Sequence, residues 1–512
     1  MVDNSSGWPR SRPSKSADEA HASRIDVAAG GGPLAHDTLA IFQAGVDAVR
    51  ADRLVMEAIT VERDAIGIGD QSIDLRAVRR IVVVGAGKAG AGMSLGLLRA
   101  LGPELITAKG LTGWVNVPAD CVRELPPIQL HAARPAGINE PTEEGGYGAE
   151  RILEMVRQCT ADDLVFFLLS GGGSALLPAP CPGITLEEKR AVTRFLSAAG
   201  ANIAELNTVR KQLSRVKGGR LARACRAGKL ITLVISDVLG DPLDLIASGP
   251  TVLDDPSTPQ EALRILDAYA ARPQIPPAIY AELERRLLTI GETAFAAEGG
   301  SPASADDSRR SVAAAPPECS TYVIGNNAVA VDGAGVAAVQ RGYSHAMWAA
   351  TSLEVDAESV GRQLAEHAWR MTRDAQGPDC LITGGEPVVK LVPSDRRGKG
   401  GRNQQLLLAA LIRILELAGD ASGNPFDGLV MLSGGTDGED GPTDAAGAYF
   451  DAAAYESLRQ SRLEPREFLE RNDAYTFFKA LDRLIVTGPT HTNVCDLRVV
   501  VTRLKSARRS PG

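Results

Sequence analysis

Carboxylates gather in one short stretch near the C-terminal end of the sequence. Residues 434–451, GGTDGEDGPTDAAGAYFD, follow the apolar run GLVMLS and contain the acids Asp437, Glu439, Asp440, Asp444 and Asp451. Burying an unpaired carboxylate is costly, so acids at a strand end indicate that a positive group binds there. An EF-hand does not fit, because the fifth and twelfth positions counted from Asp437 are Gly441 and Ala448. Mg²⁺, which uses one or two carboxylates with substrate phosphates, fits better.

A further acid, Asp237, follows the apolar run LITLVIS at the end of a predicted strand. A turn or capping role is as common for an aspartate at such a place, and this stretch alone leaves both interpretations open. A tight turn around Gly438 could present Asp437 and Asp440 to one point. We therefore predict that Asp237, Asp437 and Asp440 bind the metal.

Two glycine-rich loops have the composition of phosphate-binding turns. The run VVVGAGKAGAG places Gly85, Gly87 and Gly90 in G-x-G-x-x-G spacing, with Lys88 inside the loop. Backbone N–H groups of such a turn and of the helix after it attract anions. The acid that a dinucleotide site needs about twenty residues later is missing, and the P-loop spacing is absent. The alternative is a tight turn with a solvated lysine.

The second loop, in LLSGGGSALLPAP, follows a fully apolar run. It contains Ser170, Gly171, Gly172, Gly173 and Ser174. One glycine is enough for a turn with positive φ, whereas three leave several N–H groups uncovered, and such groups can hold an anion. This loop is therefore predicted to bind phosphate.

A basic loop, RRGKGGRNQQ, leads into a long apolar helix. Arg402 in its first turn opposes the helix dipole, which favours a bidentate contact between this arginine and an anion. Further polar residues stand at other loop ends. The residues predicted to bind substrate or phosphate are Gly85, Gly87, Ser170, Gly171, Gly172, Gly173, Ser174, Asn326, Glu386, Asn403, Gln404 and Asn493.

The elements that must position these residues follow a repeating pattern. Six β-rich runs end in small-residue loops, and helical stretches often follow: RIVVVGAG, LVFFLLSGGG, LITLVISD, STYVIGNN, CLITGGE and GLVMLSGG. This alternation predicts an α/β fold with parallel strands, whose ligands bind beyond the carboxyl ends of the strands. At the start of the pattern, residues 36–60 are expected to form one amphipathic helix with Leu39, Phe42, Val46 and Val49 on its apolar stripe.

The domain boundaries are expected to follow changes in composition. Residues 1–35 lack a hydrophobic core and are predicted to be a disordered tail, and residues 295–320, rich in Ala, Ser, Pro and Gly, to be a flexible linker or loop. Between them, residues 36–294 would form a first domain with a parallel sheet. Residues 321–504 would form a second domain.

Composition excludes several classes of protein. The 512 residues carry a net charge of -8 and no basic strip with interleaved aromatic residues, so no nucleic-acid partner is expected. No apolar run is long enough to cross a membrane. The seven cysteines are widely spaced and odd in number, which indicates a reducing compartment, and we expect the cytoplasm.

Taken in their order, the motifs resemble the class II glycerate 2-kinase family, whose C-terminal half is called the MOFRL domain. The matching stretches, between about residues 42 and 501, are VGAGKAGAGM, LLSGGGSALLPAP, LNTVRKQLSRVKGGRLA, ISDVLGDPLDLIASGPTV, GGEP, GKGGRNQ, GGTDGEDGPTDAAGA and TGPTHTNVCDL. The resemblance implies that residues 36–294 form a Rossmann-like domain and that residues 321–504 form a smaller α/β domain of the MOFRL type. It also implies phosphorylation of D-glycerate to 2-phospho-D-glycerate with ATP and Mg²⁺, at a site between the two domains. It implies that Lys88 and Arg402 are the key cations, and we assign Asp237 to catalysis with them. A homodimer remains open.

Two other functions compete with this one. An NAD(P)H-dependent hydroxypyruvate reductase is supported by the G-x-G-x-x-G turn alone and weakened by the missing acid. A non-catalytic sensor of a nucleotide or metabolite would be expected to lack catalytic groups, yet each of these groups is present.

Overall fold

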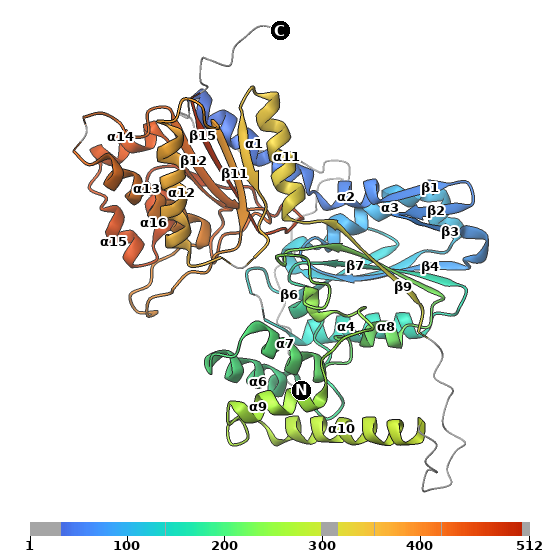
Figure 1. Ribbon diagram of the computed structural model, residues 1–512. Coiled ribbons are helices and arrows are strands. Elements are labelled where there is room, and N and C mark those ends of the chain that lie inside the picture. The colour runs from blue at the N-terminus through green and yellow to red at the C-terminus, as the bar shows by residue number, and fades with distance from the viewer. Residues whose placement is uncertain (1–31, 139, 298–315, 353, 421, 504–512) are drawn as a thin grey trace, which may run out of the picture.

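The computed structural model describes residues 32–138, 140–297, 316–352, 354–420 and 422–503, with no account of side chains for 290–297. The described chain forms two lobes, each built around a six-stranded sheet (Figure 1). A small hairpin sheet of β1 (Ile59–Glu62), β2 (Ala65–Ile68) and β3 (Gln71–Asp74) lies beside the first of them. The expected two-part α/β architecture is confirmed.

The sheet of the first lobe is entirely parallel. Its order is β6-β5-β4-β7-β8-β9, formed by β4 (Arg80–Ala86), β5 (Thr112–Pro118), β6 (Ile128–Arg134), β7 (Asp163–Ser170), β8 (Lys229–Ile235) and β9 (Glu318–Gly325). The first strand therefore lies inside the sheet, and the order reverses between β4 and β7. A reversal of this kind opens a crevice at the carboxyl ends of the two strands, where α/β proteins bind ligands.

Helices cover both faces of this sheet, and a separate group of helices lies below it. The elements are α2 (Ala51–Ala58), α3 (Gly90–Ala108), α4 (Glu143–Arg157), α5 (Gly173–Leu176), α6 (Leu186–Ala198), α7 (Ile203–Gln212), α8 (Arg220–Ala224), α9 (Pro259–Ala268) and α10 (Pro277–Ala297). Every residue of β7 is buried, as expected for a strand covered on both faces. Helices α6, α7, α9 and α10 pack around an apolar cluster of their own (Figure 1).

The sheet of the second lobe is mixed. Its order is β10-β11-β15-β12-β13-β14, formed by β10 (His345–Trp348), β11 (Cys380–Gly385), β12 (Leu429–Gly435), β13 (Gly447–Phe450), β14 (Leu484–Ile485) and β15 (Asp496–Thr502). Strand β15 runs antiparallel to β11 and β12, which therefore run in the same direction and end at the same edge. Other helices of this lobe are α11 (Asn327–Gln340), α12 (Ala357–Met371), α13 (Arg402–Ala418), α14 (Ala452–Gln460), α15 (Pro465–Glu470) and α16 (Ala474–Ala480).

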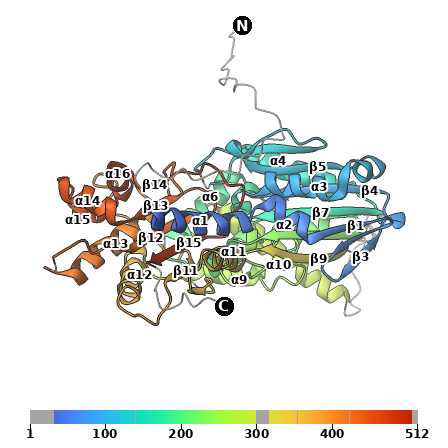
Figure 2. The ribbon, with the colours of Figure 1, turned by 90° about the horizontal axis from the view of Figure 1, so that it is seen from above.

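The beginning of the described chain belongs to both lobes. The single helix expected over residues 36–60 is two helices, α1 (Pro33–Ala48) and α2, separated at Val49 and Arg50. The predicted apolar stripe is buried, but α1 packs on α11 and the second sheet whereas α2 packs on α3 (Figure 2). Because of the break, the apolar residues of α1 pack in the core of the second lobe and those of α2 pack in the core of the first. Residues 32–35 of the expected tail are described, and Pro33 begins α1; residues 1–31 lie outside the described residues.

The expected start of the second domain at Thr321 falls inside β9. This strand pairs in parallel with β8 along its length, so it completes the first sheet, and the chain enters the second lobe at α11. Of the expected linker, residues 295–297 end α10 and 318–320 begin β9, while 298–315 lie outside the described residues. A change in composition marks the long connection but carries no information about the sheet that the next strand joins. None of the helices in the described ranges combines the length and apolarity needed to cross a membrane.

The contact between α1 and the second lobe can be tested at Gly45. A Cβ atom there would lie 2.8 Å from the carbonyl oxygen of Ala330 and 2.5 Å from Cδ2 of Leu497. We expect Gly45→Ala to destabilise the protein by about 1–3 kcal/mol because the backbone of α11 must move. The thermal midpoint measures this effect.

The matched control is Gly146→Ala in α4, where the nearest atom to the added methyl group would be 3.8 Å away. This helical substitution should leave the midpoint unchanged or raise it. Equal midpoints for the two variants would show that α1 is not held tightly against the second lobe.

Candidate active site between the two sheets

Lys88 joins the two lobes. It lies in the turn between β4 and α3, and its Nζ is 2.7 Å from Oδ2 of Asp437 and 2.6 Å from Oε2 of Glu439, both in the loop after β12. Burial alone would lower the pKa of this lysine, but the two carboxylates outweigh it and hold the pKa above its ordinary value. Lys88 is therefore a charged group at the interface, and the interpretation as a solvated lysine is wrong.

The two predicted phosphate loops lie against each other at the crevice of the first sheet. Ser170 Oγ accepts a hydrogen bond of 3.0 Å from the Ala89 N–H, and the Lys88 N–H donates to the Gly171 carbonyl at 2.9 Å. Gly87 has φ +149°, and a Cβ there would lie 2.0 Å from Ser170 Oγ. Only glycine fits at this approach. The bonds fix the position of the Lys88 backbone beside the triple-glycine loop.

Asp237 lies two residues after the end of β8 and faces the second lobe. Its Oδ2 accepts a hydrogen bond of 2.9 Å from Asn493 Nδ2. Desolvation raises the pKa of the Asp237 carboxyl to about 7, and the nearby charge of Glu386 adds to the rise. Asp237, Glu386 and Asn493 were all predicted as site residues, and the structure brings the three together.

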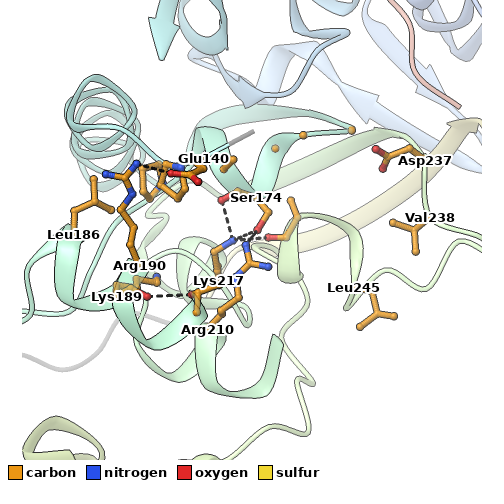
Figure 3. Close-up of a pocket in the computed structure, with 18 of the residues that line it drawn as sticks. Glu140, Ser174, Leu186, Lys189, Arg190, Arg210, Lys217, Asp237, Val238 and Leu245 are labelled. Atoms are coloured by element: carbon orange, nitrogen blue, oxygen red, sulfur yellow. Dashed lines mark hydrogen bonds and ion pairs between the residues drawn. The ribbon is translucent and has the colours of Figure 1, made fainter. Parts of the chain in front are cut away.

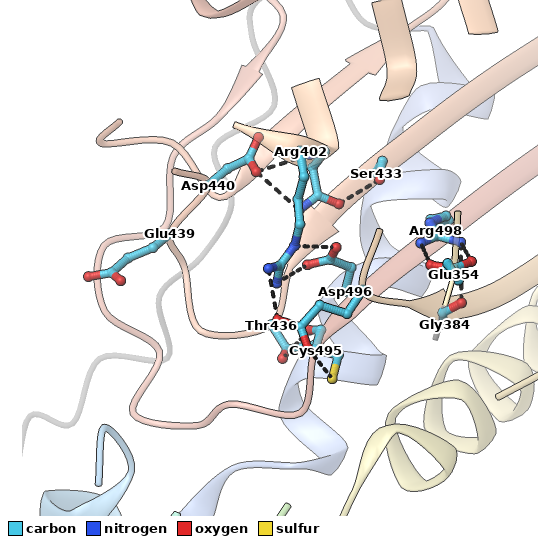
Figure 4. A network of polar contacts seen from close by, with 12 residues as sticks. Glu354, Gly384, Arg402, Ser433, Thr436, Glu439, Asp440, Cys495, Asp496 and Arg498 are labelled. Carbon is cyan, nitrogen blue, oxygen red and sulfur yellow. Dashed lines mark hydrogen bonds and ion pairs between the residues drawn. The ribbon is translucent and has the colours of Figure 1, made fainter. Parts of the chain in front are cut away.

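Arg402 is held by carboxylates of its own lobe (Figure 4). It binds Asp496 in a bidentate manner, Nε to Oδ2 at 2.7 Å and Nη2 to Oδ1 at 3.0 Å, and its Nη1 is 2.9 Å from Glu386 Oε1. Burial opposes the charge, but the carboxylates outweigh it, so the pKa lies above its ordinary value. The expected bidentate partner is thus an acid of the protein. Asp496 was missed by the sequence prediction, although it is the first residue of the apolar strand β15.

Asp440 does not face the site, which corrects its prediction as a metal ligand. The side chain is buried; Oδ1 accepts the Asn403 N–H at 3.0 Å, and Oδ2 accepts the Gln404 N–H at 2.9 Å. These are free N–H groups of the first turn of α13, where a carboxylate is stabilising. Within the described ranges, no group of three or more His, Cys, Asp or Glu residues has a geometry that could hold a metal ion. The expected trio with Asp237 and Asp437 is therefore not formed.

Three of the predicted substrate-binding residues instead hold elements in place. Asn403 is buried and its Oδ1 accepts from Ser433 Oγ at 2.6 Å, and Gln404 Oε1 accepts from the Gly401 N–H at 3.2 Å. Asn326 caps α11 through the Val329 N–H at 3.3 Å. Asn403 and Gln404 keep the turn around Arg402 in position, while the Arg402 side chain remains 32% exposed.

A cavity of about 380 Å³ opens on the other side of the triple-glycine loop (Figure 3). Ser170, Gly171–Ser174 and Asp237 line it, together with cations that the sequence prediction missed: Lys189, Arg190, Arg194, Arg210 and Lys217. Two of these lie in LNTVRKQLSRVKGGRLA, a motif that carried the family resemblance without an assigned role. The site therefore has a cationic cavity on one side of the glycine loop and mixed charges on the other.

Comparisons with known proteins agree with this architecture. A family model described as a domain of unknown function, DUF4147, matches residues 37–284, and one described as the MOFRL family matches residues 379–496. A glycerate kinase of Danio rerio is 34% identical, covering 90% of this chain and 96% of its own length. A D-glycerate 2-kinase of Thermotoga maritima is also 34% identical, with coverage of 89% and 95%.

One relative and one solved structure complete the comparison. A protein of Agrobacterium vitis named a putative hydroxypyruvate reductase is 37% identical over 82% of this chain and 99% of its own. The crystal structure of the glycerate kinase from Thermotoga maritima superposes with a TM-score of 0.72 at 32% identity, covering 92% of this chain and 100% of that one. With similarity over both lobes and nearly the full length of these relatives, the chain belongs to the glycerate kinase family that contains a MOFRL domain.

Proposed function

We propose that the protein transfers the terminal phosphoryl group of ATP to O2 of D-glycerate, giving ADP and 2-phospho-D-glycerate. The observation that carries this proposal is the contact of Lys88, in a phosphate-binding type of turn, with Asp437 and Glu439 of the other lobe. Phosphoryl transfer needs positioned cations against the charge that spreads over the phosphoryl oxygens. The names of the relatives from Danio rerio and Thermotoga maritima support the acceptor and the reaction.

Lys88 and Arg402 are the cations that we assign to this charge. Each is balanced by carboxylates of the protein, so each is charged and held in place. A preorganised cation of this kind stabilises developing negative charge without further reorganisation. Gly171–Gly173 supply N–H groups beside Lys88, and Asn493 orients the Asp237 carboxyl.

Mg²⁺ fits this site at Asp237 and Asp437. The charges of Glu386 and Asp437 contribute to the raised pKa of Asp237, so a cation here would relieve a repulsion that the substrate-free site contains. Two carboxylates with substrate phosphates are a usual ligand set for this ion. When bound, Mg²⁺ supplies neutralisation of the phosphate charge. Asp440 is left out because its oxygens are taken by the N–H groups of α13.

Reduction of hydroxypyruvate with NAD(P)H is less well supported. The pyrophosphate of such a cofactor would lie over the turn between β4 and α3, where Asp437 and Glu439 surround Lys88 and would repel it. The strand that would carry the ribose-binding acid, β5, ends in Pro118. A non-catalytic sensor is also disfavoured, because Lys88, Arg402 and Asp237 are all in place.

All seven cysteines are free, and we propose the cytoplasm as the site of action.

Product analysis tests the reaction directly. The purified protein, with D-glycerate, ATP and Mg²⁺, should release ADP and 2-phospho-D-glycerate, identified by phosphorus NMR. Oxidation of NADH with hydroxypyruvate, and no ADP from glycerate, would establish the reductase instead.

Removing the Lys88 charge should lower kcat/KM for D-glycerate roughly 100- to 1,000-fold, the range found when one donor to developing charge is lost. The variant is Lys88→Met, and steady-state kinetics with a thermal midpoint for folding measures the effect. Lys229→Met is the matched control, because Lys229 begins β8 at the opposite edge of the sheet and pairs with Glu318 there. An unchanged kcat/KM in Lys88→Met would refute the assignment.

Asp237 and Asp440 should behave differently. Asp237→Asn should raise the Mg²⁺ concentration for half-maximal rate while the thermal midpoint stays close to that of the wild type, because a metal ligand is weakened. Asp440→Ala should lower stability by about 1–3 kcal/mol because two buried N–H groups lose their acceptor. Titrations of rate against Mg²⁺ measure the first effect, and thermal unfolding measures the second. If Asp440→Ala instead raised the Mg²⁺ requirement and Asp237→Asn lowered stability, Asp440 would be the metal ligand.

A further inference from the structure

Three cations of the cavity beside the triple-glycine loop have no counter-charge. Lys189, Arg210 and Lys217 form no ion pair within 4.0 Å in the part of the chain that the structure describes. Lys217 is 1% exposed and its Nζ donates to Ser174 Oγ at 2.5 Å and to the Ser174 carbonyl at 3.2 Å. Arg210 also donates to Ser174 Oγ. The oxygens of Ser174 thus accept hydrogen bonds from Lys217 and Arg210. Because these oxygens are neutral, they do not balance the positive charge of the two side chains.

Lys189 has the least compensation of the three cations, since its buried Nζ has no hydrogen-bond partner among the described residues. Its side chain lies on α6 and is 7% exposed. Burial, with the charge of Arg210 acting in the same direction, lowers the pKa of Lys189 to about 7. An ammonium group in such surroundings costs free energy unless an anion joins it.

The neighbouring Lys211 is also buried, but it has carboxylate partners. Its Nζ lies 2.7 Å from Oδ1 of Asp255 and 3.4 Å from Oδ2 of Asp244. The rim cation Arg190 is likewise paired, with Glu140. Lys211 and Arg190 thus have carboxylate partners, whereas Lys189, Arg210 and Lys217, which converge on the cavity, have none among the described residues (Figure 3).

We propose that this cavity binds the polyphosphate chain of the nucleoside triphosphate, with Lys189, Arg210 and Lys217 as its counter-charges. The proposal rests on the proposed kinase function. Several phosphates carry enough negative charge for three cations, whereas the glycerate acceptor carries one carboxylate. Part of the remaining wall is apolar and suits the base of a nucleotide: Pro141, Pro178, Leu186, Val238 and Leu245.

The position of the cavity agrees with transfer toward Lys88. Asp237 lines the end of the cavity that lies away from the three cations (Figure 3). Gly172 separates the cavity from Lys88, since a Cβ on this glycine would lie 3.6 Å from Lys88 Cγ. A nucleotide with its inner phosphates at the cations would therefore direct its terminal phosphoryl group along Gly171–Gly173 toward Asp237 and Lys88.

Equilibrium binding to the full chain tests this assignment. A non-hydrolysable ATP analogue with Mg²⁺, adenosine, and D-glycerate are titrated separately by calorimetry into the wild type, Lys189→Met, Lys189→Arg and the control Lys229→Met. We expect Lys189→Met to weaken the analogue about tenfold or more, the loss of one charge-assisted contact. Binding of D-glycerate and of adenosine should be unchanged, and Lys189→Arg should retain most of the analogue affinity. Inorganic tripolyphosphate should compete with the analogue.

Stability separates binding from folding. Because Lys189 is unpaired, Lys189→Met should not lower the thermal midpoint, and a large drop would show that the side chain has a structural role and overturn the proposal. An unchanged affinity for the analogue in Lys189→Met, or a loss confined to D-glycerate, would also overturn it. A wild type that phosphorylates glycerate while the variants bind nucleotide normally refutes only this cavity. A wild type that neither binds the analogue nor releases ADP refutes the kinase function as well.

Discussion

The balance of charge across the boundary between the two sheets is the constraint on which this structure depends. Asp437 and Glu439 follow a buried strand of the second lobe, and Lys88 of the first lobe neutralises them. Close to them, Asp496 and Glu386 hold Arg402 within the second lobe. Lys88, Asp437 and Glu439 are paired only when the two lobes meet, because either side alone would leave its charges without a partner in a partly buried place. The ion pairs therefore fix where the lobes meet and keep cations ready for anionic substrates.

Much of the surrounding chain serves to place these charges. Ser170 fixes the turn that carries Lys88, and Gly87 permits the close approach of the two loops. Asp440 and Gln404 secure the first turn of α13, so that Arg402 leaves the helix toward Asp496. On the far side of the glycine loop, Lys189 and its neighbours lack such compensation, and this difference identifies the cavity as a place for an anion.

Local patterns predicted the local parts of this arrangement. The six β-rich runs are strands, and the loops after β4, β7, β8, β11 and β12 converge because the carboxyl ends of such strands share an edge. Partners far apart in sequence could not be predicted. Asp496 is 94 positions from Arg402, and Asp440 is 37 positions from Asn403, whose N–H it accepts. The sheet that β9 joins is fixed by pairing with β8, which no feature of residues 295–320 encodes. A missing counter-charge, as at Lys189, is visible only in three dimensions.

A structure of the ternary complex tests the central claim most directly. Crystals grown with D-glycerate, Mg²⁺ and a non-hydrolysable ATP analogue should show the inner phosphates beside Lys189, Arg210 and Lys217. The terminal phosphate should lie along Gly171–Gly173, and glycerate should lie on the Lys88 side of the loop with its O2 toward that phosphate. A nucleotide lying over the turn between β4 and α3, with the cationic cavity unused, would contradict the account.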